Sequence, residues 1–344
     1  MYVPSLRLVF LGSKPSELLC RFARYGVVAL IKLYLFQPLK IFDKTSLTEY
    51  NKNRNERLLV KEKFMSEKCT HNCSTCGSSC KSRKQESMLK EPNKQSNIKK
   101  VIGIVSGKGG VGKSLTTSLL SAYANKLGKS VGIMDADVTG PSIPHMFGVH
   151  EHATGSEKGI DTVLSPSGIQ MMSMNLLLDS ESTPVVWRGM VISGTVLQFW
   201  TDVIWRDVDL LFIDMPPGTG DVPLTVFQSI PIAGIVIVTT PQDLVEMVVK
   251  KAVNMANMMG VPVLGLVENM SYLTCPDCDK KIEVFGPSKA KKLADEYGIP
   301  AIAQLPLDAN IAKLADQGRI EDYETTAFED IFNVIEKAER FDAK

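Results

Sequence analysis

The clearest indication of chemistry in the sequence is a run of eight residues: Gly107, Lys108, Gly109, Gly110, Val111, Gly112, Lys113 and Ser114. The run fits the pattern G-x-x-x-x-G-K-[ST], in which the backbone N–H groups of a glycine-rich loop surround phosphate oxygens. The second-to-last residue, Lys113, would reach the β- and γ-phosphates, and the hydroxyl of Ser114 would ligate Mg²⁺. The run therefore predicts a site for ATP and Mg²⁺. It also contains Lys108, a second lysine that the pattern does not require.

Two further segments supply carboxylates for the same chemistry. Four apolar residues end in Asp214, which is the pattern of a Walker B strand whose carboxylate engages Mg²⁺. Asp135 and Asp137 follow another apolar run, and we assign the catalytic role to Asp137 because it lies further out toward the phosphates. Its carboxylate can orient an attacking water. Gly218 lies four residues beyond Asp214, where a loop can bring its N–H to the γ-phosphate.

Six of the seven cysteines fall into two clusters. The first cluster has the spacing C-x3-C-x2-C-x3-C and consists of Cys69, Cys73, Cys76 and Cys80. Four thiolates this close together can surround one metal centre, and soft sulfur ligands suit either an iron–sulfur cluster or zinc. The polar segment 81–99 that follows reads as a flexible linker, so we expect the array to be tethered to the main domain.

The second cluster is the pair Cys275 and Cys278, separated by Pro-Asp. Two thiolates supply half of the ligands of a [4Fe–4S] cluster or a closed zinc site. The other two ligands have three possible sources: the array at 69–80, a redox disulfide in place of a metal, or a second copy of the chain. The last arrangement also gives Lys108 a role, since it can reach the partner's phosphate as an arginine finger does.

The elements that must position these residues follow an alternating strand and helix pattern. This alternation predicts an α/β domain with a mostly parallel β-sheet flanked by helices, and ligands at the carboxyl ends of the strands. The expected strands are 101–106, 130–135, 169–174, 208–214, 234–240, 263–268 and 301–305. The expected helices include 113–127, 242–259, 288–297 and a C-terminal one within 326–340.

The sequence divides into three parts: an extension over 1–64, a cysteine-rich tail and linker over 65–98, and a P-loop ATPase domain over 99–344. The first part is net basic and reads as a transit peptide, a membrane-surface helix, or a misassigned start before Met65, which we favour. The last part is net acidic, which argues against nucleic-acid binding. We expect no membrane association for 65–344, and we expect a cytoplasmic protein because its cysteines are clustered as metal ligands.

The loop with its second lysine resembles the deviant Walker A motif of the MinD/ParA/nitrogenase-iron-protein class. Four other stretches resemble the Mrp/ApbC branch of iron–sulfur carrier ATPases: 135–144, 186–189, 214–221 and 268–278. The resemblance implies a homodimer that binds ATP and holds a labile [4Fe–4S] cluster between Cys275 and Cys278 of both copies. It also implies transfer of the cluster to apo-proteins, with slow ATP hydrolysis.

The same resemblance assigns individual roles. Lys108 would be the signature lysine, and Asp137 and Asp214 the switch carboxylates. Asn269 and the loop Pro306-Leu307-Asp308 would contact adenine. The alternatives are a positioning ATPase of the MinD/ParA type, which leaves both cysteine sets unexplained, an electron-transfer protein like the nitrogenase iron protein, and a zinc-stabilised ATPase.

Overall fold

The computed structural model describes residues 88–138, 140–178, 189–242 and 245–339. The expected extension 1–64, the start at Met65 and the cysteine array Cys69 to Cys80 lie outside these ranges, as do residues 186–188. The helices of the described part are α4 (Lys113–Lys126), α5 (Ile143–Met146), α6 (Gly189–Thr201), α7 (Asp221–Ser229), α8 (Val245–Met259), α9 (Ala290–Tyr297), α10 (Ala309–Asp316) and α11 (Glu329–Lys337), with 3₁₀ turns η2 (Met174–Leu176) and η3 (Ile320–Asp322).

The strands of the described part form one large and one small sheet. They are β1 (Ile98–Ser106), β2 (Val131–Asp135), β3 (Gly155–Ser156), β4 (Gly159–Asp161), β5 (Val163–Leu164), β6 (Gln170–Met172), β7 (Val203–Ile204), β8 (Val208–Asp214), β9 (Gly234–Thr239), β10 (Val263–Thr274), β11 (Lys281–Ile282) and β12 (Ile302–Pro306). The large sheet has the order β11-β10-β9-β1-β8-β2-β6-β5, with β12 also paired to β10. Only β5 and β11, at its ends, pair antiparallel. The predicted parallel α/β fold is thus confirmed.

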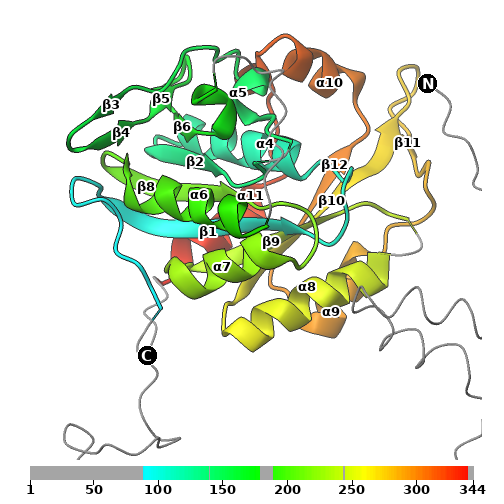
Figure 1. Cartoon of the computed structure of the whole chain (residues 1–344). Coiled ribbons are helices and arrows are strands. Elements are labelled where there is room, and N and C mark those ends of the chain that lie inside the picture. The colour runs from blue at the N-terminus through cyan, green and yellow to red at the C-terminus, as the bar shows by residue number, and fades with distance from the viewer. Residues whose placement is uncertain (1–87, 139, 179–188, 243–244, 340–344) are drawn as a thin grey trace, which may run out of the picture. The chain divides into compact units, whose positions relative to one another are not determined.

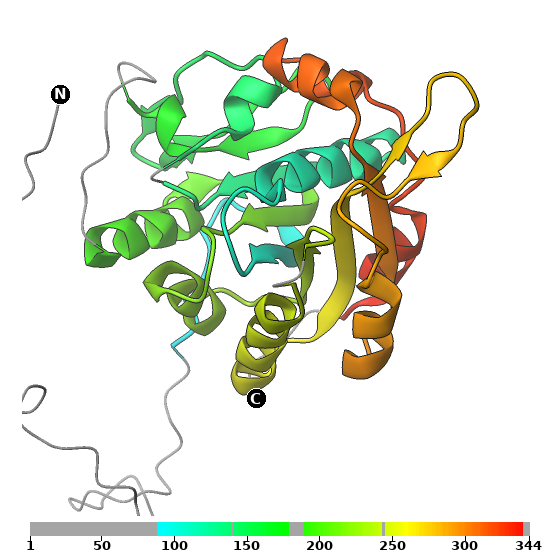
Figure 2. The ribbon, with the colours of Figure 1, turned by 90° about the vertical axis from the view of Figure 1, so that its right-hand side faces the viewer.

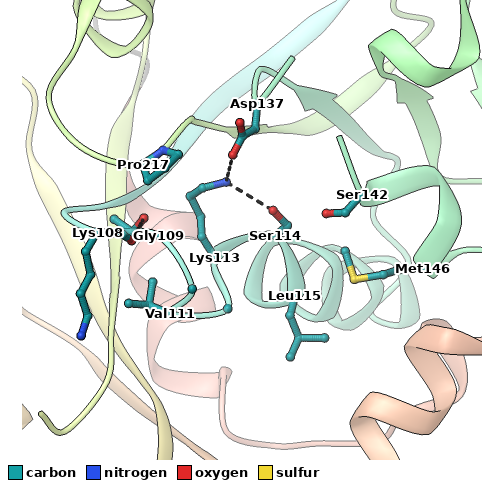
Figure 3. Close-up of a pocket in the computed structure, with 13 residues that line it drawn as sticks. Lys108, Gly109, Val111, Lys113, Ser114, Leu115, Asp137, Ser142, Met146 and Pro217 are labelled. Atoms are coloured by element: carbon teal, nitrogen blue, oxygen red, sulfur yellow. Dashed lines mark hydrogen bonds and ion pairs between the residues drawn. The ribbon is translucent and has the colours of Figure 1, made fainter. Parts of the chain in front are cut away.

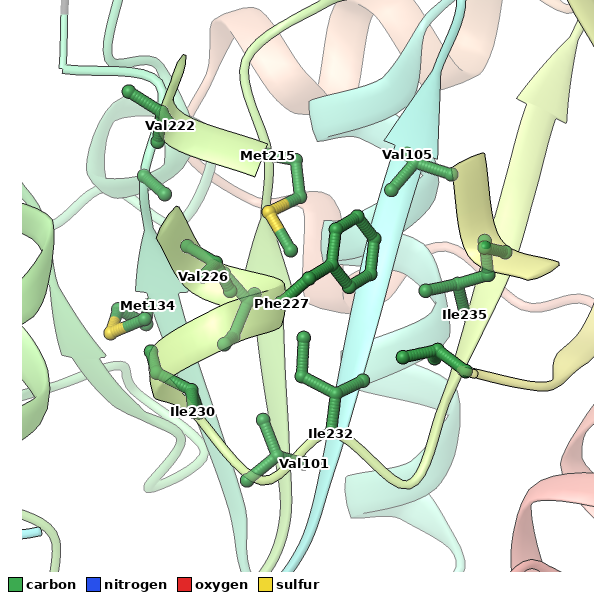
Figure 4. Close-up of a cluster of buried hydrophobic side chains, with 14 of the residues drawn as sticks. Val101, Val105, Met134, Met215, Val222, Val226, Phe227, Ile230, Ile232 and Ile235 are labelled. Atoms are coloured by element: carbon green, nitrogen blue, oxygen red, sulfur yellow. The ribbon is translucent and has the colours of Figure 1, made fainter. Parts of the chain in front are cut away.

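Helices cover both faces of the large sheet (Figures 1 and 2). Successive residues of β8 point to opposite faces, so Leu211 and Ile213 join one buried cluster while Leu210 and Phe212 join the other. The first cluster contains apolar residues of α6, α7, α8 and α9, and the second contains those of α4, α5, α10 and α11. Figure 4 shows the first cluster around α7, where Val226 and Phe227 lie among residues of the central strands. The sheet is thus buried between two apolar layers, one on each face.

Most predicted elements are confirmed, and two strands end at clearly different residues from those expected. The strand expected over 169–174 stops at Met172, and Met174 begins the 3₁₀ turn η2. The strand expected to end at 268 continues as β10 to Thr274, because pairing with β11 and β12 extends it. No helix in the described ranges is both long enough and apolar enough to cross a bilayer.

The linker prediction is wrong for the segment 88–97, which is attached to the main domain. Lys90 N–H donates to the carbonyl of Ser229, and the indole N–H of Trp200 donates to the carbonyl of Lys90. Further along, Asn97 N–H donates to the carbonyl of Trp205. These bonds involve the backbone, so the polar composition of the segment gave no sign of them.

Candidate functional site

The phosphate-loop run lies between the end of β1 and the start of α4, as predicted. Gly112 precedes α4 with φ +80°, a left-handed conformation that favours glycine, and a Cβ there would lie 2.1 Å from Asn269 Nδ2. Gly107 is required for a different reason, because a Cβ there would lie 2.2 Å from Val248 Cγ1 of α8. The first amides of α4 are left free to face an anion. The glycines therefore let the loop fold tightly over the helix N-terminus.

A pocket of about 310 Å³ opens above this loop (Figure 3). Its lining joins the loop to side chains that lie far away in the sequence, including Asp137, Ser142, Met146 and Pro217. From the loop it includes Lys108, Gly109, Gly110, Val111, Gly112, Lys113 and Ser114. The structure thus brings Asp137 to the phosphate loop, as the sequence predicted.

Lys113 is the centre of a buried charge cluster. Its side chain is 6% exposed, and its Nζ lies 2.8 Å from Asp214 Oδ2 and 3.7 Å from Asp137 Oδ2. Ser114 Oγ donates to the same Asp214 oxygen over 2.6 Å, while Thr117 Oγ1 donates to Asp214 Oδ1 over 2.8 Å. Hydroxyl and carboxylate oxygens are ligands that Mg²⁺ accepts. Ser114 and Asp214 therefore form a donor set suited to Mg²⁺, and Lys113 a cation suited to phosphate.

Asp135 lies beneath this cluster and is fully buried. Its Oδ2 accepts a hydrogen bond from Ser173 Oγ over 3.0 Å, and its Oδ1 accepts one from Asp137 N–H over 3.1 Å. Burial, reinforced by the charge of Asp214, raises the pKa of Asp135 to about 8. Asp135 therefore holds a proton at neutral pH and acts as a support for Asp137.

The predicted signature lysine, Lys108, does not point at Lys113. Its Nζ donates to Gln242 Oε1, and in Figure 3 the side chain extends away from the ion pair of Lys113 and Asp137. The ammonium group is therefore directed away from this chain's own phosphate site. This orientation is what a lysine acting on a partner's nucleotide requires, and that role stays a prediction.

Several residues predicted to contact the nucleotide have other partners in the structure. The Gly218 N–H donates to the carbonyl of Ser106 over 2.8 Å, so a bond to the γ-phosphate requires this one to break. Asn269 Nδ2 donates to the carbonyl of Val111 in the phosphate loop over 3.0 Å. Asp308 caps α10 by accepting from Asn310 N–H, and it also accepts from Tyr323 Oη. Pro306 ends β12, and neither it, Asn269 nor Asp308 lines the pocket.

The cysteine pair lies on the hairpin between β10 and β11, which projects from the sheet (Figures 1 and 2). Cys275 is half-buried, Cys278 is exposed, and neither forms a disulfide. The N–H of Cys275 donates to the carbonyl of Lys280, and the N–H of Asp279 donates to the carbonyl of Cys275. The backbone N–H of Asp277, together with hydrogen bonds from Cys278, lowers the pKa of the Cys275 thiol. The turn thus favours the thiolate, the form that binds metals.

Sequence reasoning missed the residues that support this chemistry. Thr117 orients Asp214 through a hydrogen bond. Its position one helical turn after Lys113, on the same face of the helix, is the sequence signal that could have identified it. Ser173 bonds Asp135 from the end of β6, and nothing in its local sequence indicates that contact. Both contacts depend on elements that meet only in the folded sheet.

Comparison with known proteins is consistent with this geometry. The ParA family model described as NUBPL iron-transfer P-loop NTPase matches residues 97–338. The iron-sulfur cluster carrier protein of Methanococcus maripaludis is 42% identical over 261 residues, covering 74% of this chain and 90% of that protein. The iron-sulfur cluster transfer protein NUBPL of Mus musculus is 43% identical over 224 residues, with 64% and 70% covered.

Solved structures agree with the fold. A nucleotide-binding protein of Archaeoglobus fulgidus, in complex with ADP, is 45% identical with a TM-score of 0.61, covering 68% of this chain and 91% of that one. The cell-division ATPase MinD of Pyrococcus furiosus shares the fold at 22% identity and a TM-score of 0.50, with 69% and 98% covered. The phosphate loop, the carboxylates gathered on it and the family match over most of the chain lead to one conclusion: this chain belongs to the NUBPL iron-transfer family of P-loop NTPases.

Proposed function

We propose that this protein is an ATP-dependent carrier of iron–sulfur clusters. In this proposal a labile [4Fe–4S] cluster is the cargo, held by Cys275 and Cys278 of two copies of the chain and passed to apo-proteins. The observation that carries the proposal is the placement of the cysteines. Both thiols lie on one projecting hairpin and neither is in a disulfide; Cys278 is exposed to a recipient's ligands and Cys275 is half-buried.

The number of ligands supports a homodimer as the holder of the cluster. A [4Fe–4S] cluster takes four thiolates, and the hairpin of one chain offers two. No group of three or more metal-ligating side chains occurs within the described ranges, so the described part of one chain does not complete such a site. A two-fold axis through the cluster supplies the missing pair from an identical hairpin. It also gives the outward-pointing Lys108 a phosphate to act on.

ATP and Mg²⁺ fit the residues of the phosphate loop. The loop amides and Lys113 would hold the phosphates, and Ser114 and Asp214 would hold Mg²⁺, which neutralises charge on the phosphates during hydrolysis. Asp137 lies at the edge of the same pocket, where it would orient the attacking water. Hydrolysis would be slow, since in this proposal ATP serves to change the conformation of the dimer, and ADP and phosphate are not products that the protein has to supply. We place the carrier in the cytoplasm, where thiols stay reduced.

Two measurements on anaerobically reconstituted protein test the proposal. Incubation with an apo-ferredoxin should restore the ferredoxin's visible absorbance while the carrier loses its own. The same transfer should fail for Cys278→Ser, which keeps the hairpin but loses one thiolate. A cluster that stays on the chain and cycles between two redox states would instead support an electron-transfer protein. A chain that holds zinc and no iron would contradict cluster carriage.

A further inference from the structure

A buried carboxylate lies on β10, the strand that leads into the cysteine hairpin, and it is not among the residues that line the phosphate-loop pocket. Glu268 of β10 is 0% exposed. Its Oε2 accepts hydrogen bonds from Ser271 Oγ over 2.6 Å and from Gln304 Nε2 over 3.2 Å, and its Oε1 accepts one from Lys289 N–H over 3.3 Å. Gln304 Nε2 also lies 2.9 Å from Ser271 Oγ. One carboxylate therefore ties together β10, β12 and the start of α9.

These bonds surround an irregularity in β10. The register with β12 shifts between Glu268 and Tyr272, and Met270 between them has φ +55°. A left-handed conformation at a residue other than glycine costs free energy and persists only where surrounding contacts impose it. Bulges of this kind redirect a strand and the side chains beyond it. The hydrogen bonds of Glu268 with Ser271 and Gln304 span this irregularity.

Met270, within the irregular segment between Glu268 and Tyr272, separates two functional segments of a single strand. On its N-terminal side, Asn269 donates to the carbonyl of Val111, and its amide packs so closely on Gly112 that no Cβ fits there. On its C-terminal side, the carbonyl of Tyr272 accepts from Leu307 N–H over 2.7 Å, and Cys275 follows the last residue of β10 directly. A shift of the phosphate loop would therefore displace Asn269. From Asn269, β10 continues to Thr274, the residue directly before Cys275.

We propose that Glu268, Ser271 and Gln304 are positioning residues that transmit the state of the phosphate loop through Asn269 and β10 to Cys275 and Cys278. The network makes the bulge stiff, so that a displacement at Asn269 reaches the hairpin instead of being absorbed at Met270. This proposal shares one assumption with the proposed function, namely that the phosphate loop binds the nucleotide. It requires no cluster, and it predicts that bound nucleotide changes the reactivity of the two thiols.

The test measures alkylation of the full chain by iodoacetamide with and without Mg-ATP. Mass spectrometry of the tryptic peptide 252–280 measures the alkylation of Cys275 and Cys278 alone, because this peptide contains none of the N-terminal cysteines. In the native sequence Mg-ATP should change the alkylation rate by about fivefold or more, the lower range of typical coupling between sites. In Ser271→Ala this ratio should fall to near one, with ATP affinity preserved. Gln304→Ala should have the same effect. Because Gln304 is at an exposed position, this variant serves as the test if Ser271→Ala folds poorly.

A matched control is available at the opposite end of the sheet. Ser165 is also buried, and its Oγ also donates to a glutamate, Glu321, over 2.6 Å. Ser165→Ala should keep the full nucleotide-dependent ratio. A native-like ratio in Ser271→Ala or Gln304→Ala, or no change on Mg-ATP binding to the native sequence, would overturn the proposal. If the ratio behaves as expected while the chain takes up no iron, the coupling stands and the cluster cargo is wrong.

Discussion

Ser114 Oγ donates a hydrogen bond to Asp214 Oδ2 over 2.6 Å, which joins the phosphate loop to the carboxyl end of β8. Asp135 is the register partner of Asp214 on the neighbouring strand β2, and β1 carries the loop on the other side of β8. The two predicted Mg²⁺ ligands are therefore already in contact, positioned by the central strands. Nucleotide binding therefore needs no rearrangement to bring these two side chains together.

Lys113→Ala should abolish tight ATP binding. The change removes the cation that faces the phosphates and leaves Asp214, which is 0% exposed, without its ion pair. Lys113 and a phosphate of bound ATP would form a buried charge pair, and truncating one partner of such a pair costs about 2–5 kcal/mol of binding free energy, so ATP affinity should fall by about 30-fold or more. Titration with a fluorescent ATP analogue measures this. Lys126→Ala, on the exposed last turn of the same helix, is the control, and an affinity for Lys113→Ala equal to that of the control would contradict the assignment.

Lys108→Ala should separate ATP binding from hydrolysis. Because its Nζ is bonded to Gln242 and directed away from Lys113, removing it should change ATP affinity by less than about threefold. The turnover number should fall by about 10-fold or more, since an in-trans cation stabilises the charge that develops on the phosphates. Equilibrium titration and phosphate release at saturating ATP measure the two quantities. Unchanged turnover would show that Lys108 has no role on a partner's nucleotide.

Asp135 should make the free energy of unfolding depend on pH. Its pKa in the folded chain, about 8, exceeds the ordinary value of 3.8, so between these values the folded state keeps a proton that the unfolded state releases. Stability contributed by this group is therefore present at low pH and declines as pH rises toward 8. Urea unfolding in EDTA without nucleotide, at several pH values, should give a shallower decline for Asp135→Asn. An identical slope in the variant would show that another group titrates.

Cys275 should react with iodoacetamide at lower pH when the chain is folded than when it is unfolded. The N–H of Asp277 and the hydrogen bonds from Cys278 stabilise the thiolate and lower the pKa of Cys275, and only the thiolate is alkylated. Fragment-ion spectra of the peptide 252–280 separate Cys275 from Cys278. The pH of half-maximal rate should shift upward in 8 M urea, where the turn is lost. A coincident pH profile in both states would mean that the turn does not activate the thiol.

Local sequence patterns were sufficient for the centre of the site and insufficient for its surroundings. The phosphate loop and the strand 208–214 were predictable because glycine spacing and continuous apolar runs are local signals. The extension of β10 to Thr274 was not, because pairing with β11 and β12 continues a strand through the mixed sequence after Asn269. The contacts of Asn269 with Val111 and of Gly218 with Ser106 were missed for the same reason, since each joins residues more than a hundred positions apart.

The central claim is that Cys275 and Cys278 of two chains share one [4Fe–4S] cluster. The most direct test is iron and sulfide analysis of the full chain after anaerobic reconstitution, combined with its mass in solution by light scattering. The native sequence should form a dimer. The double variant Cys275→Ala, Cys278→Ala should contain about four fewer iron atoms per two chains than the native sequence. Iron bound at the N-terminal cysteines stays in both samples and cancels in the difference. Equal iron content in the two proteins, or full loading of a monomer, would contradict the claim.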